Sequence, residues 1–135
     1  ATALVKCTLR SDGEEAGMIV MGRDYSYISL RRSDDRLWLR VAGCTDADLG
    51  TTEHELRSQE VQTGELYLRL TVESGAVCRF SYSIDGEVFT DAGDRFTARQ
   101  GMWIGAKTGF FALRKDFTND AGYIDIDWFR ILTTD

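Results

Sequence analysis

The sequence predicts an all-β protein, an antiparallel β-sandwich formed by residues 1–135 as a single domain. Apolar and polar residues alternate in short runs, and clusters of Gly, Asp and Ser separate these runs. Eight or so short strands with turns this regular are typical of a β-sandwich. The predicted strands are residues 3–9, 16–21, 27–31, 37–42, 65–73, 76–84, 103–112 and 123–132.

The alternation is clearest in two neighbouring runs, "ELYLRLTVE" and "AVCRFSYSI". The short turn "ESGA" joins them, so the two runs are predicted to form an antiparallel hairpin. The long polar connection at residues 46–64 is less informative, and its part at residues 53–61 fits either a short strand or a helical turn. The apolar phase of the hairpin consists of Leu66, Leu68, Leu70 and Val72, followed by Cys78, Phe80, Tyr82 and Ile84.

Three glycines, Gly101, Gly105 and Gly109, recur at regular spacing near the end of the chain. They match no phosphate-binding loop, and no helical pattern follows them. Glycine within a strand marks a bulge, a bend or the close approach of another backbone. We therefore expect Gly105 to be packed closely in a bulged strand, so that Gly105→Val is destabilising.

The composition excludes several classes of protein. The net charge is −6 and the basic residues are scattered, which disfavours nucleic acid as a partner. No run of 18 or more apolar residues occurs, so no membrane partner is expected. The chain begins at Ala1 without an initiator Met or a leader, which indicates a processed product or a fragment of a larger multidomain protein.

The three cysteines, Cys7, Cys44 and Cys78, lack the spacing of metal ligands. Cys7 and Cys78 lie on the apolar phase of their strands, where a free thiol packs as a small buried hydrophobe. One disulfide between these two remains an alternative. The cysteines therefore leave the compartment open between bacterial cytoplasm, periplasm and secretion.

No catalytic constellation can be assembled from the sequence. The only histidine, His54, lies between Glu53 and Glu55 in the polar connection, so we expect no Ser-His-Asp triad, and one histidine cannot form a multi-histidine metal site. Asp125 and Asp127 alternate on a strand, about 6.5 to 7 Å apart, a separation found in inverting glycosidases. Neighbours on one strand flank a bound sugar poorly, however. The alternatives for this pair are a structural calcium contact by one of the two, hydrogen bonds to a neighbouring loop, or plain exposure, and no other cofactor is expected.

Several aromatic residues could stack on a sugar ring. Tyr25 and Tyr27, beside the polar turn "GRD", are the better surface candidates, and Trp38 and Trp103 are further ones. Trp128 is in phase with its apolar strand neighbours and is predicted to lie in the core.

Four segments carry a resemblance to a known family. Together they resemble the C-terminal concanavalin A-like β-sandwich of glycoside hydrolase family 43 enzymes, which are β-xylosidases and α-L-arabinofuranosidases. The match covers nearly the whole chain in pieces and is strongest after residue 80. The segments are "EEAGMIVMGRDYSYISLRR", "FSYSIDGEVF", "GDRFTARQGMWIGAKTGFFA" and "GYIDIDWFRI".

The resemblance implies an accessory domain without catalytic residues. In this family the catalytic carboxylates lie in a separate five-bladed propeller, the implied partner, and no propeller sequence is present here. The sandwich packs on the propeller and can lend an aromatic side chain to the rim of its active site; Trp103 is the matching position, although interdomain packing and simple burial remain alternatives. The family's sandwich is usually longer at its N-terminus, which raises the expectation of a truncated or minimal version.

Three functions are therefore considered. The first is a non-catalytic domain that shapes the pocket of a xylan- or arabinoxylan-degrading glycosidase. The second is a free-standing carbohydrate-binding, lectin-like module that binds xylo- or arabino-oligosaccharides through Tyr25, Tyr27, Trp38 or Trp103. The third, least favoured, is an independent hydrolase that uses Asp125 and Asp127.

Overall fold

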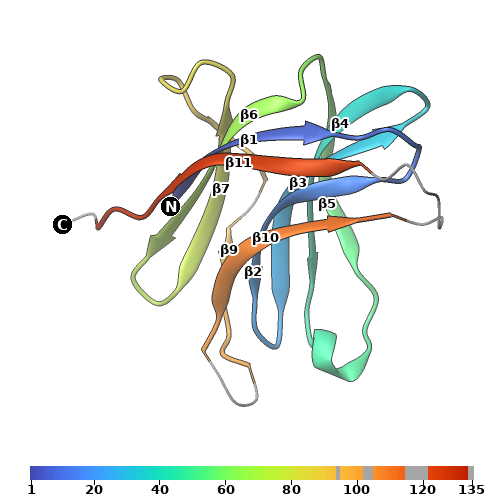
Figure 1. Cartoon of the computed structure of the whole chain (residues 1–135). Helices are drawn as coiled ribbons and strands as arrows, with labels where there is room; N and C mark the ends of the chain where they lie inside the picture. The colour runs from blue at the N-terminus through green and yellow to red at the C-terminus, as the bar shows by residue number, and fades with distance from the viewer. Residues whose placement is uncertain (94, 102–104, 115–121, 134–135) are drawn as a thin grey trace.

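The computed structural model describes residues 1–93, 95–101, 105–114 and 122–133. Within these residues two antiparallel sheets stack face to face, and their strands are curved (Figure 1). The prediction of an all-β antiparallel sandwich is confirmed. A single 3-10 turn, η1 (Ala47–Leu49), is the helical element of this part of the chain, and none of its helices is long and apolar enough to cross a membrane.

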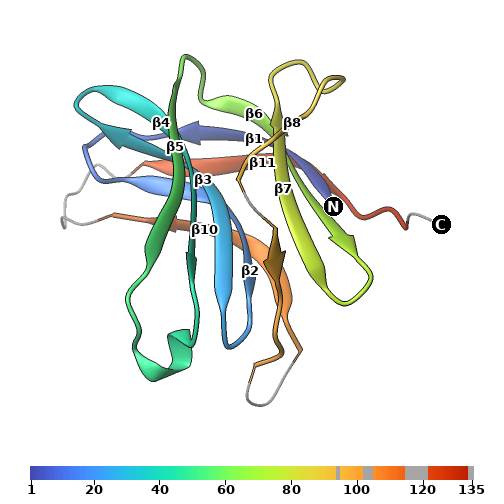
Figure 2. The same ribbon diagram turned by 180° about the vertical axis from the view of Figure 1, so that it is seen from behind.

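The first sheet has the strand order β11-β1-β6-β7-β8, and β9 also pairs with β7; Figure 2 shows these two short strands beside β7. The second sheet has the order β10-β2-β3-β4-β5. Strands of the first sheet are β1 (Thr2–Thr8), β6 (Glu65–Glu73), β7 (Val77–Ser83), β8 (Thr90–Asp91), β9 (Phe96–Thr97) and β11 (Tyr123–Arg130). Strands of the second are β2 (Glu15–Met21), β3 (Tyr25–Ser33), β4 (Arg36–Cys44), β5 (His54–Val61) and β10 (Lys107–Leu113).

The predicted hairpin is confirmed, because β6 and β7 pair antiparallel from Tyr67 with Ser83 to Glu73 with Val77. The open question at residues 53–61 is resolved as a strand, β5, which pairs with β4 at the edge of the second sheet. Residues 103–112 were predicted as one strand. The observed strand β10 begins only at Lys107, and residues 102–104 lie outside the described part.

The core lies between the two sheets and follows from the period-two alternation. Residues of one phase face the other sheet, and most of them are almost completely buried. Cys7 and Cys78 belong to this core, as predicted, and all three cysteines are free thiols rather than a disulfide. The largest fully buried side chains are Phe80, Met18, Ile28, Leu30, Leu39, Leu66, Leu68 and Leu70.

A β-bulge corrects the prediction that Trp128 lies in the core. Strand β11 pairs Ile126 with Val5 but Trp128 with Leu4, so one extra residue intervenes. Such an extra residue shifts the alternation by one position. Trp128 therefore lies on the outer phase of the first sheet, half-buried, with its ring centroid 6.0 Å from that of Tyr67.

The apolar alternation of the hairpin stops before its predicted ends. Val72 is 54% exposed although it follows the buried phase of β6. Ile84 lies one residue beyond β7 and is 70% exposed. The two layers therefore cover less of the hairpin than the sequence pattern predicts.

An arginine fixes the segment after β9 to the second sheet. Arg99 donates hydrogen bonds to both carboxylate oxygens of Asp24 and one to Asp46, each at 2.5 Å. Asp24 is buried, and these bonds from Arg99 hold the pKa of its carboxyl below the ordinary value. The contact ties residues 75 positions apart in the sequence.

The prediction of close packing at Gly105 is wrong. Gly105 lies two residues before β10, and an added Cβ atom would meet no described atom within 4 Å. Close approach occurs instead at Gly17 in β2, where a Cβ atom would collide with the carbonyl oxygen of Ile28 and lie 2.6 Å from the Cα atom of Ser29.

Substitution of Gly17 should therefore be destabilising, which the sequence analysis expected at Gly105 instead. Gly17→Ala places a methyl group against the backbone of β3, which cannot move without disturbing the sheet. It should lower the free energy of unfolding by about 1–3 kcal/mol or more. Gly109→Ala in β10 has open space at the Cβ position and serves as the control. Urea unfolding of both variants measures the difference, and equal stability of the two would contradict the close approach.

Candidate functional site

The outer face of the second sheet carries an unusual set of hydrogen-bonded polar side chains, several of which are buried. Opposite the core phase of β2, β3 and β4, the alternation places a layer of charged and hydroxyl groups. Such groups are normally left in water when they face outward. We name this set the tyrosine-arginine cluster; its members are Glu15, Tyr25, Tyr27, Ser29, Arg40, Glu53 and Glu55.

Arg40 of β4 lies at the centre of the cluster and is only 8% exposed. Its Nη1 atom donates to Glu15 Oε2 at 2.5 Å and to the Tyr27 hydroxyl at 3.2 Å. Its Nε atom donates to Glu55 Oε1 at 2.6 Å. Burial acts to lower the pKa of Arg40, but the bonds with Glu55 and Glu15 outweigh it and raise the pKa above its ordinary value.

Both tyrosines of the cluster are tied to one carboxylate. The Tyr25 hydroxyl donates to Glu53 Oε2 at 2.6 Å, and the Tyr27 hydroxyl donates to Glu53 Oε1 at 2.7 Å. Their rings stack with centroids 6.2 Å apart, and Phe111 meets Tyr27 edge-on at 4.9 Å. Burial, followed by the bond to Glu53, raises the pKa of each phenol, so both tyrosines stay protonated donors at neutral pH.

These contacts correct one prediction about the candidate sugar contacts. Tyr27 was expected at the surface, but it is 5% exposed because Phe111, Tyr25 and the cluster enclose it. Tyr25 is half-buried and Trp38 is half-buried, so both retain accessible surface on this face. Trp103, the remaining candidate, lies outside the described residues.

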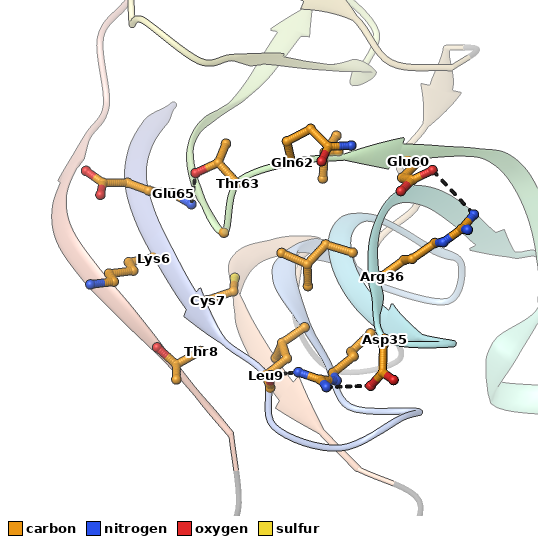
Figure 3. A pocket seen from close by; sticks show the side chains of 14 residues that line it. Lys6, Cys7, Thr8, Leu9, Asp35, Arg36, Glu60, Gln62, Thr63 and Glu65 are labelled. Carbon is orange, nitrogen blue, oxygen red and sulfur yellow. Dashed lines mark hydrogen bonds and ion pairs between the residues drawn. The ribbon is translucent and has the colours of Figure 1, made fainter.

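A cavity of about 560 Å³ opens at one end of the sandwich, where β1 and the β5–β6 connection meet the β3–β4 turn (Figure 3). Its rim is charged, with Arg36 and Glu60 paired at 3.7 Å, and Cys7 lies in its wall. Burial raises the pKa of the Cys7 thiol to about 12. A thiol that is protonated at neutral pH is a poor nucleophile, so this cavity offers no cysteine chemistry.

Asp125 and Asp127 do not form a regular pair on one strand. Asp125 lies opposite Lys6, whereas Asp127 is the extra residue of the bulge and has no cross-strand partner. The predicted carboxylate separation assumed an uninterrupted strand and does not apply here. Both side chains are exposed and line an open hollow of about 510 Å³ with Lys6 and Glu65. Within the described residues no group of three or more His, Cys, Asp or Glu side chains could hold a metal ion.

The comparison with protein families decides the class of the chain. Residues 1–132 match the family model described as the β-xylosidase C-terminal concanavalin A-like domain. The chain belongs to this family. The resemblance noted in the sequence is thereby confirmed, and the domain is one found in family 43 glycoside hydrolases.

One curated protein and one solved structure are similar to this chain. A β-xylosidase of Formosa agariphila is 39% identical over 70 residues, which are 52% of this chain and 11% of that protein. A solved structure of a bifunctional GH43-CE protein of Bacteroides eggerthii has a TM-score of 0.74 at 17% identity, covering 91% of this chain and 16% of that one. At this identity the structural likeness supports the fold alone. The domain spans only a small part of either relative.

Sequence reasoning missed the charged members of the tyrosine-arginine cluster. Arg40 alternates with Leu39 and Val41 in "LWLRVAG", so the same period-two pattern already placed it on the outer face. Glu15 has the equivalent position in β2. The sequence contained no signal that these outward side chains would meet and be buried, because burial depends on the strand order β2-β3-β4-β5.

The central ion pair yields a test of the cluster. Arg40→Met leaves the carboxylate of Glu15, whose side chain is 6% exposed, buried without its cation. Breaking a buried pair in this way costs about 3–5 kcal/mol of stability. Because replacing both partners removes the uncompensated charge, Arg40→Met combined with Glu15→Leu should be more stable than Arg40→Met alone. Arg36→Met, whose partner Glu60 is at the surface, is the control; a loss as small as the control's would contradict a buried pair.

Proposed function

We propose that the domain is a non-catalytic accessory module of a plant-polysaccharide glycoside hydrolase acting on xylan or arabinoxylan. In this role it packs on a separate catalytic propeller of the same chain and shapes its active site. The observation that carries the proposal is the family match over residues 1–132, since the matched model describes the C-terminal domain of β-xylosidases. Carbohydrate chemistry of the parent is supported by the β-xylosidase relative.

The described side chains support a role without bond cleavage. His54 is exposed on the edge strand β5, and the three cysteines are buried. Asp125 and Asp127 are open to solvent and lie on one strand. Two carboxyl groups that cleave a glycosidic bond flank it, which neighbours on one strand do poorly.

An exposed apolar surface at one end of the first sheet supports docking on another domain. We name it the terminal patch; it consists of Val72, Phe129, Ile131 and Leu132, which are 54%, 39%, 74% and 78% exposed. With Leu70 and Ala1 they line a hollow of about 460 Å³. Contiguous exposed apolar surface of this kind marks an interaction site.

The first residue of β1's leading segment, Ala1, lies at the edge of the terminal patch. Ala1 lines the same hollow, and its amino group donates to the carbonyl oxygen of Leu70 at 2.7 Å. Figure 1 shows the N-terminus beside the C-terminal end of β11. The matched family model describes a C-terminal domain of β-xylosidases, and we assign the patch to the catalytic propeller as its docking partner.

Two equally exposed isoleucines provide the test in the glycosidase that contains this domain. Ile131→Asp places a charge in the terminal patch, whereas Ile84→Asp changes a side chain outside it. Burying one isoleucine is worth about 1.5–3 kcal/mol, so Ile131→Asp should loosen docking and lower kcat/KM on aryl β-xyloside. Ile84→Asp should leave it unchanged.

The stability of each variant is measured in the isolated domain, so that a loss of docking can be distinguished from unfolding. Both variants alter exposed side chains, so each should unfold within about 0.5 kcal/mol of the unmodified domain. Two outcomes would contradict the accessory role: equal kcat/KM for both variants in the parent enzyme, or hydrolysis of aryl β-xyloside by the isolated domain that Asp127→Asn abolishes.

A second function, binding of xylo- or arabino-oligosaccharides, is favoured by the tyrosine-arginine cluster. Its fixed donors and carboxylates lie beside the half-buried rings of Tyr25 and Trp38. Sugar sites combine an aromatic platform with a few oriented polar groups. Tyr25→Ala should therefore reduce retardation of the isolated domain on a xylan affinity gel, while Tyr123→Ala, on the other sheet, should not. Equal retardation of the two variants would contradict sugar binding by the outer face of the second sheet.

A further inference from the structure

A small hollow beside Trp38 lies on the outer face of the second sheet, at the end of the tyrosine-arginine cluster. Its volume is about 250 Å³. Pockets for drug-sized ligands begin at about 300 Å³, so this hollow suits a single sugar ring. Strands β3, β4 and β5 supply its lining, which consists of Arg31, Ser33, Trp38, Arg40, Glu55 and Ser58.

Arg31 is the unusual residue of this hollow. Its guanidinium group has no hydrogen bond, ion pair or ring contact with any described residue, and its Nε atom is buried without an acceptor. Nearby arginines differ: Arg36 pairs with Glu60, and Arg40 pairs with Glu15 and Glu55. A partly buried cation without an acceptor is unfavourable unless another molecule supplies one.

The other polar groups of the hollow either have hydrogen-bond partners within the protein or can bond to hydroxyl groups of a ligand. Both carboxylates near Arg40 bond to that residue, and neither forms a hydrogen bond or ion pair with Arg31. The indole Nε1 atom of Trp38 donates to the carbonyl oxygen of Ser33 at 3.3 Å, so the ring offers an apolar surface rather than a donor. Ser58 and the second oxygen of Glu55 are left to meet sugar hydroxyls.

We propose that this hollow binds a hexuronic acid residue, a sugar that carries a carboxylate. The carboxylate accepts hydrogen bonds from the fork of terminal nitrogens of Arg31, a pairing that arginine makes in bidentate form. The pyranose ring packs on Trp38, and its hydroxyls face Ser58 and Glu55. Glu55 repels a second negative charge, which orients the ligand carboxylate toward Arg31.

Other ligands fit the hollow less well. A neutral pentose would give the Arg31 guanidinium no charged acceptor. A small inorganic anion would supply that acceptor but would leave the indole and the serine hydroxyl without a contact. The inference rests on the second function above, sugar binding by this face, and narrows it to polysaccharides that bear uronic acid side groups. It is independent of docking at the terminal patch.

Titration of the 135-residue domain at low ionic strength tests the inference, with the Trp38 indole N–H resonance as the readout. The probes are methyl α-D-glucuronoside, methyl β-D-xyloside and sodium acetate, and Trp38→Phe assigns the resonance. The glucuronoside should bind about tenfold or more tightly than either of the others, because a charge-assisted bond adds to ring contacts. Arg31→Gln should weaken glucuronoside binding about ten- to a hundredfold, and Arg36→Gln should leave it unchanged.

Arg31→Lys keeps the charge but not the fork, so partial binding by this variant supports the bidentate pairing. Thermal unfolding and amide spectra of each variant verify that the fold is retained. Three results would overturn the inference: no saturable shift with glucuronoside, equal affinity in Arg31→Gln, or acetate binding as tightly as glucuronoside. Binding of the xyloside as tightly as the glucuronoside by the unmodified domain would also overturn it while leaving neutral sugar binding by this face intact.

Discussion

The apolar layer between the two sheets determines where every other side chain lies. Because strand residues alternate, burying Met18, Ile28 and Leu39 in this layer forces Gly17, Tyr27 and Arg40 outward. A shift of one residue in any of these strands would exchange the two sets. The candidate site is thus a consequence of the core: its side chains share one face because their neighbours share the other.

Burying polar side chains on the outer face of the second sheet costs free energy of hydration. Arg40 and Glu15 give up most of their hydration, and this loss is offset only because each finds several partners. A core of the same shape would form without them, so they contribute little that hydrophobic packing could not. What they do provide is a rigid arrangement of donors and carboxylates beside Tyr25 and Trp38, which is a property of a binding surface rather than of a stable sheet.

The sequence predicts the sandwich well because alternation is a local property that is read from neighbouring residues. Prediction from the sequence fails where the alternation is interrupted or where a side chain is covered by a strand that is distant in the chain. The bulge at Asp127 places Trp128 on the opposite face from the predicted one, and no residue type in "IDIDWF" predicts a bulge. Tyr27 was expected outside because a polar turn precedes it, yet Phe111, 84 positions later in the chain, covers its ring. Arg31, Arg40 and Glu15 escaped notice because charged residues on an outer face are ordinarily solvated.

The two surfaces lie on different parts of the sandwich, and this separation bears on how the roles combine. The terminal patch belongs to β6, to β11 and to the residues that follow it, with β10 at its border. The hollow at Trp38 belongs to β3, β4 and β5, and β5 lies at the opposite edge of the second sheet from β10. A domain docked on the patch therefore leaves the edge strand β5 and its neighbours uncovered. A sandwich held at one end by a catalytic partner would present its other face to the polysaccharide, so that support of an active site and recognition of a charged side group are compatible in one small domain.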